Sequence, residues 1–233
     1  MRILSLDTST STAVLALMDG ATPLAEMRLA AGQKRGERIA DALRFLLAQA
    51  DWKPEDVEGY AVGLGPGSFT GLRTGLALVK GLVIAHPRPV VGVSTLHALA
   101  LNAAGFNGAI LPLIDARKGQ VFTARFRSDG QGAVARETED AAVFPQDLDR
   151  IAPEPALLLG DGLRRYGELI AAHRGHHDLI APEGLWSPAG PMIAELARPR
   201  LDRGETDPIE SLVPIYVRSS DAELGLGAQK SSQ

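Results

Sequence analysis

The chain of 233 residues contains no cysteine, and this absence removes several kinds of chemistry at once. Without thiols there are no disulfides, no thiolate zinc sites and no cysteine nucleophile. Two catalytic patterns are also missing, the HExxH of zinc peptidases and the GxSxG of serine hydrolases. These absences leave a peptidase as a weak hypothesis.

A basic surplus is lacking too, because the formal net charge is -4. A dedicated nucleic-acid binder usually carries an excess of Lys and Arg. Asp7 interrupts the first apolar run, which does not fit a signal peptide. The longest apolar helix candidate, residues 72–85, includes Arg73 and Lys80 and is too short to span a bilayer. We therefore expect a cytoplasmic protein without a membrane segment.

What is present is an alternation of strand and helix patterns, which indicates an α/β fold. The first half predicts strands at residues 3–7, 13–18, 23–29, 60–64 and 90–93, with helices at 38–50, 72–85 and 94–104. The second half predicts strands at 109–115, 120–127 and 156–159, with helices at 163–172 and 188–196. In each half the first strand ends in an aspartate, so we infer an internal duplication with a boundary near 104–107.

A glycine-rich loop, residues 65–71, joins the strand at 60–64 to the helix at 72–85. Gly65 and Gly67 permit backbone angles closed to other residues, and Ser68 or Thr70 can cap the helix. Such a loop can hold an anion, dock a partner or simply reverse the chain. The lysine of a GxxxxGK[ST] phosphate loop is absent, which weakens the first interpretation.

Two hairpins after the aspartate-ended strands are candidate phosphate sites. A carboxylate there can orient a metal-bound water and hydroxyls can contact phosphate, but turn-capping side chains have the same composition. The second hairpin has a single glycine, whereas close approach of an anion favours more. The candidate residues are Asp7, Thr8, Ser9, Thr10, Asp115 and Gly119.

The helix at 72–85 is apolar over more than one stripe, with Arg73, Thr74 and Lys80 as its clearly polar residues. A helix of this kind is either enclosed in its own domain or contacts another subunit. Gly71 and Gly75, four residues apart, would let a neighbouring helix approach closely. We expect a protein interface here.

The order and spacing of five segments resemble the bacterial TsaB proteins over almost the whole chain. The block Gly65-Pro66-Gly67-Ser68-Phe69-Thr70-Gly71-Leu72-Arg73 is the most specific of them. One departure is Gly36-Glu37, where the family usually carries a His-Ser pair, so no role of that histidine can be transferred. The remaining matches are Leu6-Asp7-Thr8-Ser9-Thr10, Gly92-Val93-Ser94-Thr95-Leu96, Asp115-Ala116-Arg117-Lys118-Gly119 and Pro214-Ile215-Tyr216-Val217-Arg218.

The resemblance implies an actin/Hsp70/sugar-kinase-like (ASKHA) fold of two related lobes, 1–105 and 106–221. The second lobe is the more eroded copy, and residues 222–233 are expected to form a disordered tail. It further implies membership of the complex that attaches threonylcarbamoyl to N6 of adenosine 37 in tRNAs that read ANN codons. In that complex TsaD is catalytic, TsaE is an ATPase, and TsaB is the partner that TsaD requires.

Several residues favour a non-catalytic role within this resemblance. Thr95 and Leu99 stand where the catalytic paralogue has its two metal-binding histidines, and neither side chain replaces an imidazole. We therefore expect no cofactor on this chain, with ATP and metal on the partner subunits and tRNA reached indirectly. The expected interface with a TsaD-like subunit comprises Ile39, Leu43, Leu46, Leu72, Arg73, Gly75, Leu76, Val79, Leu82 and Val83.

An alternative remains open, an independent ATPase or small-molecule kinase of the same fold that uses Asp7 and Asp115. Without its partner the chain could pair with itself through the same apolar patch. The sequence leaves open direct contact with tRNA and residual binding of nucleotide.

Overall fold

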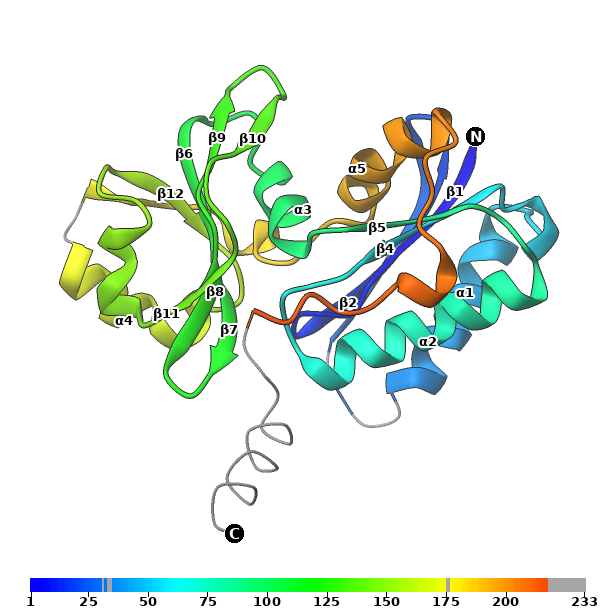
Figure 1. The fold of residues 1–233 in the computed structure, drawn as a ribbon, viewed down its shortest axis with the longest axis horizontal. Coiled ribbons are helices and arrows are strands. Elements are labelled where there is room, and N and C mark those ends of the chain that lie inside the picture. The colour runs from blue at the N-terminus through cyan, green and yellow to red at the C-terminus, as the bar shows by residue number, and fades with distance from the viewer. Residues whose placement is uncertain (31, 33–34, 175–176, 218–233) are drawn as a thin grey trace, which may run out of the picture.

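A computed structural model shows two lobes side by side, each built around its own five-stranded sheet (Figure 1). It describes residues 1–30, 32, 35–174 and 177–217, so the tail predicted at 222–233 lies outside the described residues. In this described part of the chain, every helix is too short or too polar to span a bilayer.

The first lobe contains a mixed sheet in the order β3-β2-β1-β4-β5. Strands β1 to β3 are antiparallel neighbours, whereas β4 and β5 run parallel to β1. The five expected strands are confirmed with small shifts at their ends. Their bounds are β1 (Arg2–Asp7), β2 (Thr12–Asp19), β3 (Thr22–Ala30), β4 (Gly59–Gly63) and β5 (Val90–Val93).

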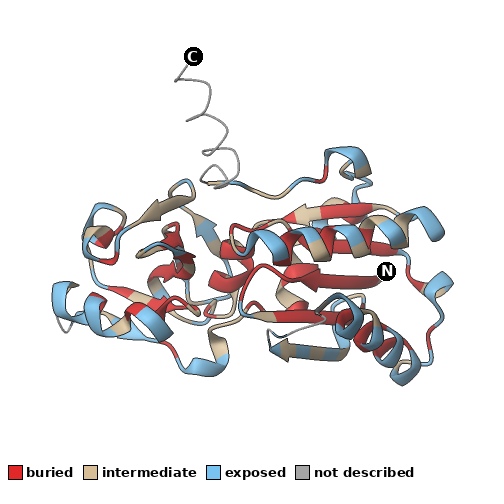
Figure 2. Ribbon diagram, turned by 90° about the horizontal axis from the view of Figure 1, so that it is seen from below, coloured by how far each residue is buried: buried red, intermediate tan, exposed pale blue. Residues whose placement is uncertain are grey.

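Helices cover both faces of this first sheet. Helices α1 (Arg35–Gln49) and α2 (Phe69–Ala85) pack side by side on one face and bury their apolar stripes against β1 to β4. The Ser68 side chain caps α2 by accepting a hydrogen bond from the Gly71 N–H at 3.3 Å, as the sequence predicted. Figure 2 shows the central strands as buried and the outer turns of the helices as exposed.

The second lobe repeats the first in its strand order, β10-β9-β6-β12-β13, which confirms the internal duplication. The copy is eroded: a 3-10 segment, Pro145–Arg150, lies where α1 would be expected, and the two strands predicted at 109–115 and 120–127 are each broken in two. A smaller sheet, β11-β8-β7, forms from the outer pieces. The bounds are β6 (Asn107–Pro112), β7 (Ile114–Arg117), β8 (Gln120–Thr123), β9 (Phe126–Asp129), β10 (Val134–Arg136), β11 (Ala141–Val143), β12 (Ala156–Leu159), β13 (Leu179–Ile180) and α4 (Leu163–Arg174).

The C-terminal part corrects the expected division of the chain at 106–221. Helix α5 (Gly190–Asp202) crosses back and packs on the face of the first sheet opposite α1 and α2. The following strap, 203–217, buries Leu212 in the first lobe's core and donates the Ile215 N–H to the Leu64 carbonyl at 2.7 Å. Residues 190–216 therefore belong to the first lobe, because without α5 one face of its sheet would be exposed, whereas Val217 packs against the core of the second lobe.

Helix α3 (Thr95–Leu101) lies between the two lobes. Leu96 and Leu99 pack into the core of the second lobe, whereas Ala98 packs with α5. The Ser94 side chain caps this helix by accepting from the His97 N–H at 3.3 Å. The strand β5 and α3 therefore carry the chain from one lobe to the other.

Candidate functional site

The first candidate residue, Asp7, ends β1 and is 1% exposed. Its Oδ1 accepts hydrogen bonds from the Ser9 N–H at 2.7 Å and the Ser9 hydroxyl at 2.6 Å. Its Oδ2 accepts from the Thr95 hydroxyl at 2.6 Å. A buried carboxylate needs such donors, so this network stabilises Asp7 in its place.

The hydroxyl residues after β1 are also engaged inside the protein. The Thr8 hydroxyl donates to the Gly71 carbonyl at 2.7 Å, and the Thr10 hydroxyl donates to the Thr12 carbonyl at 2.8 Å. Thr8, Ser9 and Thr10 each expose 2% of their surface or less. Their hydroxyls serve turn geometry and packing in this conformation, and none of the three faces solvent.

The glycine-rich loop lies directly on the first hairpin. The Ser68 N–H donates to the Ser9 carbonyl at 2.6 Å, and a Cβ on Gly67 would lie 2.3 Å from that oxygen. A Cβ on Gly63 would lie 1.8 Å from Asp7 Oδ2. A side chain at Gly67 would force the loop away from the hairpin, and one at Gly63 at the end of β4 would displace the Asp7 carboxylate. The loop thus packs directly against the hairpin at Ser9.

The second hairpin presents a different environment. Its turn places Lys118 and Gly119 at φ of 50° and 82°, a pair of left-handed residues that suits a tight hairpin. The Asp115 carboxylate accepts from the Tyr166 hydroxyl at 3.3 Å and lies 3.4 Å from Arg117 Nη1. Burial and the neighbouring Asp115 charge raise the pKa of the Tyr166 phenol. Asp115 is thus held by side chains of its own lobe.

Asp161 joins the two hairpins, although it is not among the site residues predicted from the sequence. Its Oδ2 accepts from the Ser11 N–H at 2.9 Å and its Oδ1 from the Asp115 N–H at 3.3 Å. The available signal was the Gly160-Asp161-Gly162 turn at the end of a strand. That turn alone could not show which backbone groups the carboxylate reaches.

The structure corrects the expected partner interface. Most of the apolar residues expected to face a partner are buried within the first lobe, namely Ile39, Leu43, Leu46, Leu72, Leu76 and Val79. Gly75 is buried too, Leu82 and Val83 are half-buried, and Arg73 is exposed. Side chains that are buried within the lobe are not available to a partner.

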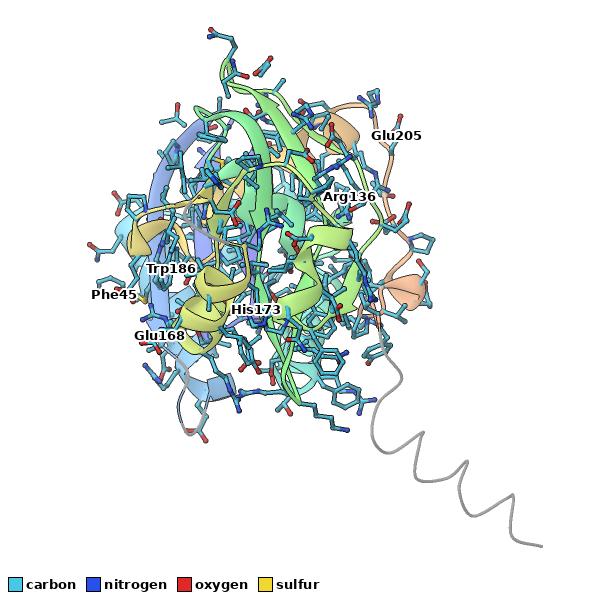
Figure 3. All side chains as sticks on the ribbon, turned by 90° about the vertical axis from the view of Figure 1, so that its left-hand side faces the viewer. Phe45, Arg136, Glu168, His173, Trp186 and Glu205 are labelled. Atoms are coloured by element: carbon cyan, nitrogen blue, oxygen red, sulfur yellow. The ribbon has the colours of Figure 1, made fainter. Side chains whose placement is uncertain are left out.

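A different set of residues forms the outer surface of these two helices. Ile84 is 77% exposed, Phe45 is 53% exposed, and both are large apolar side chains. Ala77 and Gly81 are exposed on the same helix as Ile84, and Figure 3 shows Phe45 of α1 at the edge of the molecule. We call Phe45, Ala77, Gly81 and Ile84 the outer helix face. It keeps the interface hypothesis on α1 and α2 but changes the residues that carry it.

No group of three or more His, Cys, Asp or Glu side chains within the described residues is placed to hold a metal ion. His173 is exposed on α4 with its Nδ1 2.8 Å from the Leu169 carbonyl. Its sequence neighbour His176 lies outside the described residues. Of the residues expected to contact nucleotide, Asp7, Thr8, Ser9 and Thr10 are buried, whereas Asp115 and Gly119 are half-buried.

Comparison with known proteins points to tRNA modification. The family described as TsaD: tRNA N6-adenosine threonylcarbamoyltransferase matches residues 28–154. The tRNA threonylcarbamoyladenosine biosynthesis protein TsaB of Bacillus subtilis is 32% identical over 226 residues, covering 96% of this chain and 96% of that protein. The TsaB protein of Escherichia coli is 31% identical over 232 residues, covering 95% of this chain and 96% of that protein.

Solved structures share the fold of this chain. YeaZ from Pseudomonas aeruginosa superposes with a TM-score of 0.78 at 28% identity, covering 92% of this chain and 99% of that chain. The Lmo2764 protein from Listeria monocytogenes superposes with a TM-score of 0.51 at 12% identity, covering 87% and 100%, which bears on the fold alone. The predicted actin/Hsp70/sugar-kinase-like fold is confirmed.

Proposed function

Because this chain belongs to the TsaB family of tRNA threonylcarbamoyladenosine biosynthesis proteins, we propose that it is the non-catalytic subunit that a TsaD-like transferase requires. It acts in the cytoplasm as a heterodimer with that transferase, joined by a TsaE-like ATPase, and reaches tRNA through the complex. The observation that carries this proposal is the enclosure of Asp7 by Ser9 and Thr95, with the glycine-rich loop on top.

The position of the absent metal ligands supports the same proposal. Thr95 and Leu99, which align with the histidines of the catalytic paralogue, are both fully buried. The Thr95 hydroxyl lies within a hydrogen-bond network, donating to Asp7 and accepting from the Gly65 N–H at 3.1 Å. Leu99 contributes to the core of the second lobe. Neither residue offers a metal ion a donor that is open to solvent.

The outer helix face is the surface that we propose for the transferase. It presents one large apolar side chain on each of two adjacent helices and small exposed residues on α2, which would let helices of a partner approach closely. The side chain of Arg73 at the start of α2 stacks over Phe69 at 3.9 Å and would lie at the rim of such a contact. In the absence of the transferase, the same face would support a homodimer.

The experiment that tests the interface is co-elution of this chain with a TsaD-like protein in size-exclusion chromatography. Ala77→Glu places a charge on the outer helix face, and we expect binding weaker by roughly tenfold or more because the charge would be buried without a partner. The control is Ala171→Glu, an exposed alanine on α4 in the other lobe. Equal co-elution of both variants with the transferase would contradict the proposed face.

The structure also changes which substitution is informative. Val79 is 2% exposed and packs in the core of the first lobe, so Val79→Glu should unfold that lobe instead of selectively breaking the complex. Circular dichroism of each variant alone separates the two effects. Ala77→Glu should keep the unfolding midpoint of the parent chain.

A second experiment separates the subunit from an independent ATPase that would use Asp7 and Asp115. Isothermal titration of the isolated chain with ATP and magnesium should show no micromolar binding. Reconstituted tRNA modification should require this chain together with the transferase. Micromolar ATP binding that disappears in Asp115→Ala would favour the independent enzyme.

A further inference from the structure

Asp161 is placed where the two hairpins of the duplicated lobes meet. It follows β12 in the second lobe, whereas Ser11 lies in the turn between β1 and β2 in the first. The hydrogen bond from the Ser11 N–H to Asp161 Oδ2, 2.9 Å long, joins residues that are 150 positions apart. In Figure 1 the turn after β1 faces the β7–β8 pair across the boundary between the lobes.

The backbone around Asp161 fixes its direction. Gly160 has a φ of 121°, and a Cβ there would lie 2.1 Å from the Leu113 carbonyl. The same carbonyl accepts from the Gly162 N–H at 2.9 Å. The turn is thus pressed onto the break between β6 and β7. A side chain on a turn held this firmly loses little conformational entropy when it forms a contact.

The chain itself crosses between the lobes elsewhere. One crossing follows α3, and the other leads from β13 to α5. The Asn102 side chain ties the two crossings together, because its Nδ2 donates to the Leu185 carbonyl at 3.0 Å and the Ser187 carbonyl at 2.7 Å. These crossings can act as a hinge, which leaves the hairpin side as the place where the lobes would separate.

We propose that the Asp161 carboxylate is a latch that holds the two lobes closed through the Ser11 and Asp115 N–H groups. Hydrogen bonds to a charged acceptor are stronger than those between neutral groups, which suits one side chain to this task. The carboxylate also occupies backbone donors of both hairpins that an anion between the lobes would need. The latch therefore keeps both lobes in one fixed arrangement and fills the boundary without a ligand.

The absence of cysteine makes the latch directly measurable. Cysteines introduced at Arg44 on α1 and Glu168 on α4, both exposed, take spin labels in different lobes (Figure 3 marks Glu168). Pulsed electron resonance then gives the distribution of interlobe distances in the full chain. Asp161→Ala should broaden this distribution and extend it to longer distances. A distribution identical to that of the labelled parent would overturn the proposal.

A matched control exists in the same lobe. Asp129 also accepts two backbone N–H groups, from Gln131 at 2.7 Å and Ala133 at 3.2 Å, but both belong to its own turn. Asp129→Ala removes the same charge and the same number of bonds without touching the lobe boundary. The interlobe distance distribution should therefore stay unchanged in this variant, and an equal broadening would refute the latch.

Hydrogen exchange gives a second readout that does not depend on labels. In the unaltered chain the Ser11 amide should be protected, and Asp161→Ala should speed its exchange by roughly tenfold or more, as expected from loss of a bond to a charged acceptor. If that variant does not fold, Asp161→Asn keeps the shape and one carbonyl oxygen, so at least one of the Ser11 and Asp115 amides should exchange faster. Unchanged exchange at both amides would overturn the proposal.

Discussion

The role of Asp7 gives the sharpest test of whether this chain is a subunit or an enzyme. An enzyme of this fold would use the carboxylate for chemistry, and its removal would abolish activity while leaving the fold intact. In the structure Asp7 is 1% exposed and accepts hydrogen bonds from the Ser9 N–H, the Ser9 hydroxyl and the Thr95 hydroxyl. We therefore expect Asp7→Ala to act on stability.

The magnitude follows from the groups that this substitution leaves behind. Three buried donors lose their acceptor, and each unsatisfied donor costs about 1–3 kcal/mol, although the terms do not add fully. The substitution leaves no buried charge behind, and relief of the carboxylate's own desolvation offsets part of this loss. From the three donors we expect Asp7→Ala to lower the free energy of unfolding by about 3–5 kcal/mol, a large part of the 5–15 kcal/mol typical of a domain.

Urea unfolding followed by circular dichroism measures this change, and Thr95→Val supplies the partner in a double-mutant cycle. Alone, Thr95→Val should cost about 1–3 kcal/mol, and it should cost less in the Asp7→Ala background because the shared hydrogen bond is already lost. A change below about 1 kcal/mol for Asp7→Ala, together with loss of tRNA modification, would refute the structural role and point to chemistry.

Two further predictions concern packing and pH. Gly75→Ala should destabilise the fold although alanine favours helices, because its Cβ would lie 2.3 Å from a hydroxyl of the first hairpin, whereas Gly81→Ala on the same helix meets nothing within 4 Å and should stabilise by about 0.5–1 kcal/mol. Thermal unfolding of the two variants measures whether each substitution lowers or raises stability. A gain in stability in both variants would contradict the close contact at Gly75. Burial acts to raise the pKa of Asp207, but hydrogen bonds from Arg200 and from the Gly92 N–H outweigh it and hold that pKa below its ordinary value. The contribution of ionised Asp207 to the stability of the folded chain is therefore fully present above the unfolded pKa of about 3.9. This contribution is lost as the pH falls through the lower pKa of the folded state. Asp207→Asn should cost about 1–2 kcal/mol at neutral pH, and chemical unfolding at several pH values should show the difference from the parent vanishing in acid.

Local patterns were sufficient for most of the elements. Apolar patterns located the first three strands, and the hydroxyl residues of the glycine-rich loop predicted that α2 is capped. These features depend on neighbours in sequence, which is why they can be read without a structure. The three short strands β10, β11 and β13 were missed because two or three residues carry too little pattern.

Local sequence patterns did not predict which residues of α2 are available to a partner. Apolar residues on α2 were expected to face a partner, yet Leu76 and Val79 pack in the lobe's own core and Leu72 is buried as well. A helix that is apolar all round has several stripes, and its sequence does not tell which stripe meets the sheet. The placement of α1 beside α2 decides that, and it leaves Ala77 and Ile84 outside.

The glycine-rich loop and Asp7 illustrate the division most clearly. Local residue patterns predict that a strand ends in Asp7, that Gly65 and Gly67 form a tight loop, and that the second half repeats the first. The contact of the loop with the hairpin, the hydrogen bond from Thr95 to Asp7 and the return of α5 to the first lobe could not be predicted in this way. The physical reason is that hydrogen bonds and packing between distant residues depend on distances in space, which residue types and spacing along the chain do not specify.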